Sequence, residues 1–169
     1  MMGIRLLVAR ASKAGVRATH RLRERQHMDA EQSETRIELR DFVDLSRNVP
    51  GLDISIREFA TTMQEYRAGI SEITTKFKIL DEDFKVRLDR NPIRTITSRL
   101  KSPRSLLEKM QRKGLPLTIP SMRENLHDIA GVRVVCNYLE DVSEIAEALL
   151  CQNDIRLVER KDYITCPKE

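Results

Sequence analysis

Apolar residues recur at helical spacing most clearly between residues 56 and 80. Ser55 and Glu58 stand at the spacing of a capping box, and apolar side chains follow at steps of three and four residues, at positions 56, 59, 63, 66, 70, 73, 77 and 80. The pattern predicts a long amphipathic helix. The same seam would suit a coiled coil, but Gly69 and the mid-size aromatic residues favour packing across a sheet.

Weaker patterns flank this helix. Residues 29–47 place apolar side chains loosely at helical spacing before a break at 48–51, and Asp81 is expected to begin a second short helix that ends before Pro92. Residues 29–90 are therefore predicted to form a helical region that precedes the rest of the domain.

The remaining pattern alternates strands with helices. Residues 94–101 and 155–158 are predicted strands, and the β-branched run 132–138 is predicted to be a central strand. Helices are expected to begin after Ser102, Ser121 and Asp141. Ser102 precedes a proline, and Ser121 has a glutamate three residues further on, as in a capping box. The first of these helices should end at Gly114. This element order predicts an α/β or α+β domain.

Composition narrows the class of protein. The chain has 169 residues, of which 40% are hydrophobic and 33% charged, so it can bury a core, and it contains no run long enough for a transmembrane helix. Three cysteines without CxxC spacing argue against a disulfide framework or a structural zinc site, and favour a reducing, cytoplasmic location. The scarcity of aromatic residues argues against a stacking platform for single-stranded nucleic acid.

Charge is concentrated in two places. Residues 1–27 carry seven Lys or Arg and a single acidic residue, Glu24. We interpret residues 1–28 as a disordered extension, whose removal should leave the melting temperature within about one degree. An organelle-targeting presequence, a nucleic-acid-binding arm and translation starting at Met28 are alternatives.

The second concentration, over residues 90–113, has eight basic residues against one Glu and combines a strand with a helix. Arg99 and Lys101 share one strand face, while Ser105, Lys109 and Arg112 share one helix face. Cationic groups beside a helix N-terminus suit a polyanion such as a polyphosphate. The alternative is a solvated basic face.

Two further charges stand near the predicted central strand. Asp128 precedes it and could serve as the carboxylate of a Mg²⁺-dependent phosphoryl or nucleotidyl transferase, or equally as the cap of a turn before Gly131. Arg133 alternates onto one strand face between two valines, where its charge should have a partner or face a ligand.

Several segments resemble the synthetase domain of the RelA/SpoT family, and more closely the stand-alone small alarmone synthetases. The matching segments are ITTKFKIL (73–80), NPI (91–93), SRLKSPRSLLEKMQRKG (98–114), HDIAGVRVVC (127–136) and KDYITCPK (161–168). The resemblance implies a nucleotidyltransferase-like mixed sheet flanked by helices over residues 29–169. It also implies transfer of pyrophosphate from ATP to the 3′-hydroxyl of GDP or GTP, which makes (p)ppGpp.

The resemblance assigns roles to individual residues. Asp128 resembles the Mg²⁺ ligand, Arg133 the arginine that stacks on adenine, and Lys161 a basic residue on the acceptor-nucleotide side. The contacts to ATP correspond to Arg99, Lys101, Ser105, Lys109 and Arg112.

The chain departs from the family pattern after KDYITCPK. The family continues into a Gly-Tyr-Arg-Ser-Leu-His loop and a later catalytic Glu, neither of which occurs here, and Glu159 and Asp162 are expected to be solvated. We therefore expect an incomplete sheet and weak or absent synthesis from this chain. The alternatives are a non-catalytic nucleotide- or RNA-binding module, and an interaction protein that pairs through residues 56–80. A monomer, dimer or tetramer is compatible with the sequence, and no membrane partner is expected.

Overall fold

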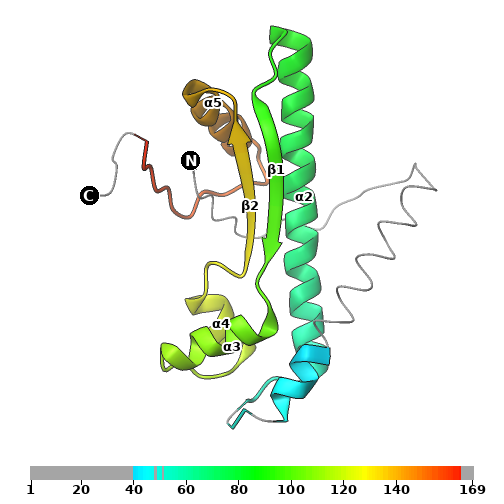
Figure 1. Ribbon diagram of the computed structural model, residues 1–169, viewed down its shortest axis with the longest axis vertical. Helices are drawn as coiled ribbons and strands as arrows, with labels where there is room; N and C mark the ends of the chain where they lie inside the picture. Colours follow the sequence, from blue (N-terminus) through cyan, green and yellow to red (C-terminus); the bar gives the residue numbers. More distant parts are fainter. Residues whose placement is uncertain (1–39, 48, 51, 165–169) are drawn as a thin grey trace, which may run out of the picture. The chain divides into compact units, whose positions relative to one another are not determined.

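The computed structural model describes residues 40–47, 49–50 and 52–164. These residues form two compact units, whose helices and strands are labelled in Figure 1. The first unit contains residues 65–100 and 130–164, and the second contains residues 40–64 and 101–129. The predicted extension 1–28 and most of the predicted helix 29–47 lie outside the described residues.

Helix α2, Ile56–Leu88, begins at the predicted capping box and supplies residues to both units. The amide of Glu58 donates to the hydroxyl of Ser55 at 3.2 Å, and the amide of Ser55 donates to the Glu58 carboxylate at 3.1 Å. The prediction of a separate helix from Asp81 is wrong, because α2 continues to Leu88. Asp81 forms an ion pair with Lys85 one turn further on, which suits a helix interior.

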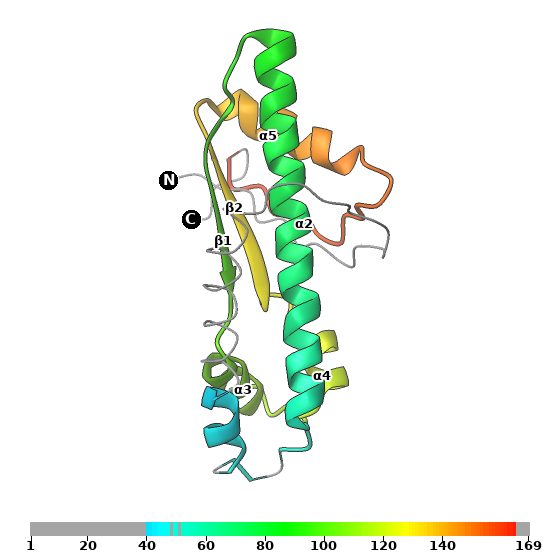
Figure 2. The ribbon, with the colours of Figure 1, turned by 90° about the vertical axis from the view of Figure 1, so that its right-hand side faces the viewer.

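The first unit is built around two antiparallel strands, β1 (Ile93–Leu100) and β2 (Ala130–Cys136). One face of this sheet packs against both α2 and α5 (Leu139–Leu150), which lie on the same side of the strands in Figure 2. The core consists of Ile73, Phe77, Ile93, Ile145 and Leu149, with Leu80, Phe84, Ile96, Val132, Val134 and Ile155 packed against it.

The sheet is smaller than the sequence indicates. Helices and a sheet are combined as expected, but in the described residues the sheet has two strands, both antiparallel, rather than a mixed arrangement. Residues 155–158 form no strand and contribute an isolated bridge at Leu157. Alternating side chains favour an extended chain locally, but a strand also needs a neighbour for its backbone hydrogen bonds.

The second unit contains helical residues 40–46, the start of α2, α3 (Pro103–Arg112) and α4 (Ile119–Asn125). The rings of Phe42 and Phe59 stack with centroids 4.0 Å apart. The other buried hydrophobic side chains of this unit include Met63, Leu106, Leu107, Met110, Leu117, Met122, Leu126 and Ile129.

Two predicted helix starts are displaced. Helix α4 begins before Ser121, since the hydroxyl of Thr118 accepts the amide of Ser121 at 3.3 Å and Pro120 is tolerated in the first turn. Asp141 is not the residue before α5 but the third residue within it. Its buried carboxylate accepts the amide of Tyr138 at 3.1 Å and forms an ion pair with Arg90 at 2.8 Å.

Candidate functional site

Helix α3 presents the cationic residues, and its local sequence explains its limits. The hydroxyl of Ser102 accepts the amide of Ser105 at 3.4 Å, and Pro103 occupies the first turn. The helix stops at the predicted Gly114, whose φ of +64° lies in the left-handed region that favours glycine. The apolar face of α3 is buried, and Lys109 lies at its margin with a partly buried side chain.

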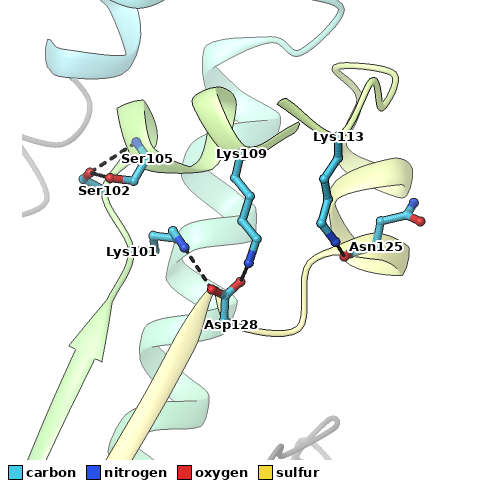
Figure 3. A network of polar contacts seen from close by, with 7 residues as sticks. All are labelled: Lys101, Ser102, Ser105, Lys109, Lys113, Asn125 and Asp128. Carbon is cyan, nitrogen blue, oxygen red and sulfur yellow. Dashed lines mark hydrogen bonds and ion pairs between the residues drawn. The ribbon is translucent and has the colours of Figure 1, made fainter. Parts of the chain in front are cut away.

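Lys101 and Lys109 converge on the carboxylate of Asp128. The Nζ of Lys101 lies 2.9 Å from Oδ2, and the Nζ of Lys109 lies 2.7 Å from Oδ1, so each lysine holds a different oxygen (Figure 3). The backbone supports this arrangement, because the amide of Lys101 donates to the carbonyl of Ile129 at 2.8 Å. We call Lys101, Lys109 and Asp128 the lysine–aspartate cluster.

The cluster is partly shielded from water. The side chains of Lys101, Lys109 and Asp128 are 17%, 21% and 23% exposed, respectively. Partial burial by itself raises the pKa of Asp128, but the hydrogen bonds and charges of Lys109 and Lys101 outweigh it and hold the pKa well below its ordinary value. The carboxylate is therefore ionised, and the cluster has an excess of one positive charge available to an anion.

The other two residues predicted on the polar face of α3 lie outside this cluster. The hydroxyl of Ser105 accepts a hydrogen bond from that of Ser102 at 3.0 Å, near the helix start. Arg112 is exposed in the last turn. Lys113, which follows the helix, donates instead to the carbonyl of Asn125 at 3.4 Å.

Arg99 and Arg133 belong to the first unit, on the two paired strands. The register places Arg99 opposite Gly131 and Arg133 opposite Thr97. Both arginines are exposed on the face turned away from Val132 and the core. The alternation predicted for these strands is therefore confirmed.

The sequence did not determine the surroundings of Asp128 and Lys161. Gly131 lies inside β2, and the chain bends at residues 127 and 129 on either side of Asp128, so the interpretation of Asp128 as a turn cap stays a prediction. Lys161 is exposed and forms an ion pair with Glu159 at 3.2 Å, while the carboxylate of Asp162 accepts the amide of Ile164 at 2.9 Å. The ion pairs of Asp128 with two lysines were not predicted, and no local spacing signals them, because 27 and 19 residues separate Asp128 from Lys101 and Lys109.

The number of possible ligands around Asp128 limits the kind of metal binding in which it can take part. In the part of the chain that the structure describes, no group of three or more His, Cys, Asp or Glu side chains could hold a metal. Mg²⁺ is often bound through one carboxylate, with substrate phosphates and water as its other ligands. The donor set therefore fits Mg²⁺ that arrives together with a polyphosphate, and does not fit a cation held by protein ligands alone.

The family model described as the region found in RelA/SpoT proteins matches residues 98–169. Residues 98–169 are thus similar to this region, which confirms the resemblance identified in the motifs of the chain. GTP pyrophosphokinase YwaC of Bacillus subtilis is 34% identical over 127 residues, which cover 75% of this chain and 60% of the relative. The chain spans less than two thirds of the length of that relative.

Solved structures show the same relationship. Small alarmone synthetase 1 of Bacillus subtilis, bound to its product pppGpp, is 30% identical with a TM-score of 0.58, over 67% of this chain and 57% of that one. The same synthetase bound to AMPCPP is 31% identical with a TM-score of 0.55, over 64% of this chain and 57% of that one. In the described residues of our chain, no helix is long and apolar enough to cross a bilayer.

Proposed function

We propose that this chain provides the donor side of a pyrophosphate transfer, in which ATP gives its β,γ-pyrophosphate to the 3′-hydroxyl of GDP or GTP to form (p)ppGpp. The observation that carries the proposal is the convergence of Lys101 and Lys109 on Asp128, at 2.9 and 2.7 Å. Two ammonium groups that already converge on one carboxylate can bind a polyanion without first having to be brought together. The relatives solved with pppGpp and AMPCPP support a nucleotide ligand.

Each residue of the cluster has a separate task in this proposal. The two lysines exchange the Asp128 carboxylate for oxygens of the polyphosphate, which carry more negative charge. Asp128, released from the lysines, would hold Mg²⁺ together with the polyphosphate. Bound Mg²⁺ would offset the negative charge of the phosphoryl oxygens during transfer.

The remaining residues are assigned by motif and by position. Ser105 and Arg112 lie on α3 and would contact phosphate, while Arg99 and Arg133 would flank the adenine. Lys161 would lie on the side of the acceptor nucleotide.

Binding of Mg-ATP to the purified chain, followed by calorimetry, tests the proposal. Lys109→Ala should weaken binding by about 1–3 kcal/mol, because it removes a charge-assisted contact to phosphate. Lys113→Ala is the matched control: it removes the same charge from the end of the same helix, but from a lysine bound to a backbone carbonyl rather than to Asp128.

We expect Lys113→Ala to bind Mg-ATP nearly as well as the parent chain. An equal loss in both variants would show that only net charge matters and would contradict the assignment of Lys109. Binding that needs no divalent metal and falls steeply with salt would instead favour an RNA-binding module.

A further inference from the structure

Lys76 is a charged residue within the apolar seam of helix α2. It follows Ile73 by three residues and precedes Leu80 by four, and this spacing places it on the face of α2 that packs against the core of the first unit. Its side chain is only 17% exposed. Because an ammonium group in such a place has lost much of its water, it needs partners that replace that water.

The partners of Lys76 lie in the turn that follows α5. Its Nζ donates to Oε1 of Gln152 at 2.7 Å and to the two carboxylate oxygens of Asp154 at 3.0 and 2.8 Å. This hydrogen bonding is the main reason that the pKa of Asp154 lies below its ordinary value. The turn is also bonded to itself, because the amide of Ile155 donates to the carbonyl of Gln152 at 3.1 Å. One lysine of α2 therefore fastens a compact turn that lies 76 to 78 residues further along the chain.

The segment that leaves this turn carries Lys161. Residues 155–162 form neither a helix nor a strand, and Ile155 at their start packs against the core. Just before Lys161, the guanidinium of Arg160 forms an ion pair with Glu147 of α5 at 2.6 Å. The segment is thus attached near both of its ends, and the lysine at the first attachment is less exposed than the arginine at the second.

We infer that Lys76 is a positioning residue for the acceptor nucleotide, because it holds the turn after α5 and so fixes the start of the segment that presents Lys161. This inference rests on the proposed function, in which Lys161 lies on the acceptor side. A segment that is free to move must be ordered when a ligand binds, and the apparent affinity falls with the fraction of time that it spends in the competent arrangement. Lys76 would supply this order before the nucleotide arrives.

The experiment compares Lys76→Met with Lys85→Met. Methionine keeps the aliphatic part of the side chain and removes the ammonium group. Lys85 is also on α2 and also forms an ion pair, but with Asp81 one turn earlier in the same helix. Lys76→Arg is a third variant, since its guanidinium can still donate to Asp154. Each variant is titrated separately with GDP and with ATP in the presence of Mg²⁺, and hydrogen–deuterium exchange is followed over residues 155–164.

We expect Lys76→Met to bind GDP about fivefold more weakly than the parent chain, the loss that follows when the competent arrangement is populated about a fifth of the time. It should bind ATP as before, and exchange over residues 155–164 should become faster. The melting temperature should fall by a few degrees at most, because Asp154 is 39% exposed and can be hydrated once the lysine is gone. Lys76→Arg should recover most of the GDP affinity, and Lys85→Met should change neither affinity.

Several outcomes would overturn the inference. Unchanged exchange over residues 155–164 in Lys76→Met, or an equal loss of GDP and ATP affinity, would show that Lys76 does not act through this segment. An equal loss of GDP affinity in Lys85→Met would show that only net charge matters, and Lys76→Arg that binds GDP no better than Lys76→Met would contradict the role of the ion pair. A parent chain that binds ATP but not GDP would overturn this inference and leave the donor site in place. Failure of ATP to bind the parent chain would overturn the proposed function, and this inference with it.

Discussion

The lysine–aspartate cluster makes Asp128→Asn the most informative single substitution. Asparagine keeps the size of the side chain but removes its charge, so Lys101 and Lys109 lose the anion that lies 2.9 and 2.7 Å from their ammonium groups. The amide oxygen can still accept from one lysine, whereas the amide nitrogen is a donor and cannot accept from the other.

The size of the effect follows from burial. An exposed ion pair contributes about 0.2–1 kcal/mol, whereas removal of one partner from a fully buried pair costs about 3–5 kcal/mol. The three side chains are 17–23% exposed, between these limits but nearer the buried one. We expect Asp128→Asn to lower the free energy of unfolding by about 2 kcal/mol, which corresponds to a fall of roughly 4–8 °C in melting temperature.

The same substitution should strengthen the binding of a polyphosphate that carries no Mg²⁺, although it weakens the fold. Because the lysines no longer neutralise a carboxylate, the variant should bind tripolyphosphate without Mg²⁺ several times more tightly than the parent chain. It should bind Mg-ATP more weakly, because the Asp128 carboxylate is no longer available to the metal. The assays are thermal unfolding and calorimetric titration with each ligand. Asp154→Asn is the control, since Asp154 pairs with a lysine too, Lys76 at 2.8 Å, but is 39% exposed and lies in the other unit.

The effect of pH gives an independent check. The folded-state pKa of Asp128 is depressed below its unfolded value of about 3.9, so the stability it contributes is present above that pH and is lost as the pH falls through the folded pKa. The difference in stability between the parent chain and Asp128→Asn should therefore be constant near neutral pH and shrink in acid. Equal melting temperatures at neutral pH, or an Asp154→Asn variant that gains the same affinity for tripolyphosphate, would refute this reasoning.

Three other substitutions test the fold by chemical denaturation. Ser102→Ala removes the N-cap of α3 and should lower the free energy of unfolding by about 1 kcal/mol. Ser102→Asp should largely keep this stability, because aspartate also accepts the amide of Ser105. Equal losses in the two variants would contradict the role of Ser102 as the cap. Arg90→Ala leaves the buried carboxylate of Asp141 without its cation and should cost about 3 kcal/mol. Adding Asp141→Asn to that variant should recover part of the loss, and no recovery would contradict the pairing. Leu149→Ala, in the core of the first unit, should cost about 3 kcal/mol, whereas a loss under about 1 kcal/mol would show that the site is not tightly packed.

The elements that the sequence predicted well depend on residues close together in the chain. The capping box at Ser55 and Glu58, the Ser102 cap and the stop at Gly114 each involve groups within a few residues, so spacing alone identifies them. The opposite faces of β1 and β2 follow from the two-residue repeat of any strand, which is why Arg133 was correctly placed away from the core.

Local patterns failed where contacts between distant residues decide the outcome. A strand over 155–158 was wrong because alternation cannot supply a neighbouring strand. The start of α4 is a different case, because Thr118 and Pro120 are local signals that compete with the capping-box spacing at Ser121. The candidate site shows the same division. The sequence alone identified Lys101, Lys109 and Asp128 as chemically suitable, but Asp128 is 27 residues from Lys101 and 19 from Lys109 in the chain. Only the tertiary structure brings the two ammonium groups onto opposite oxygens of one carboxylate, because an ion pair depends on distance in space and no local spacing rule encodes it.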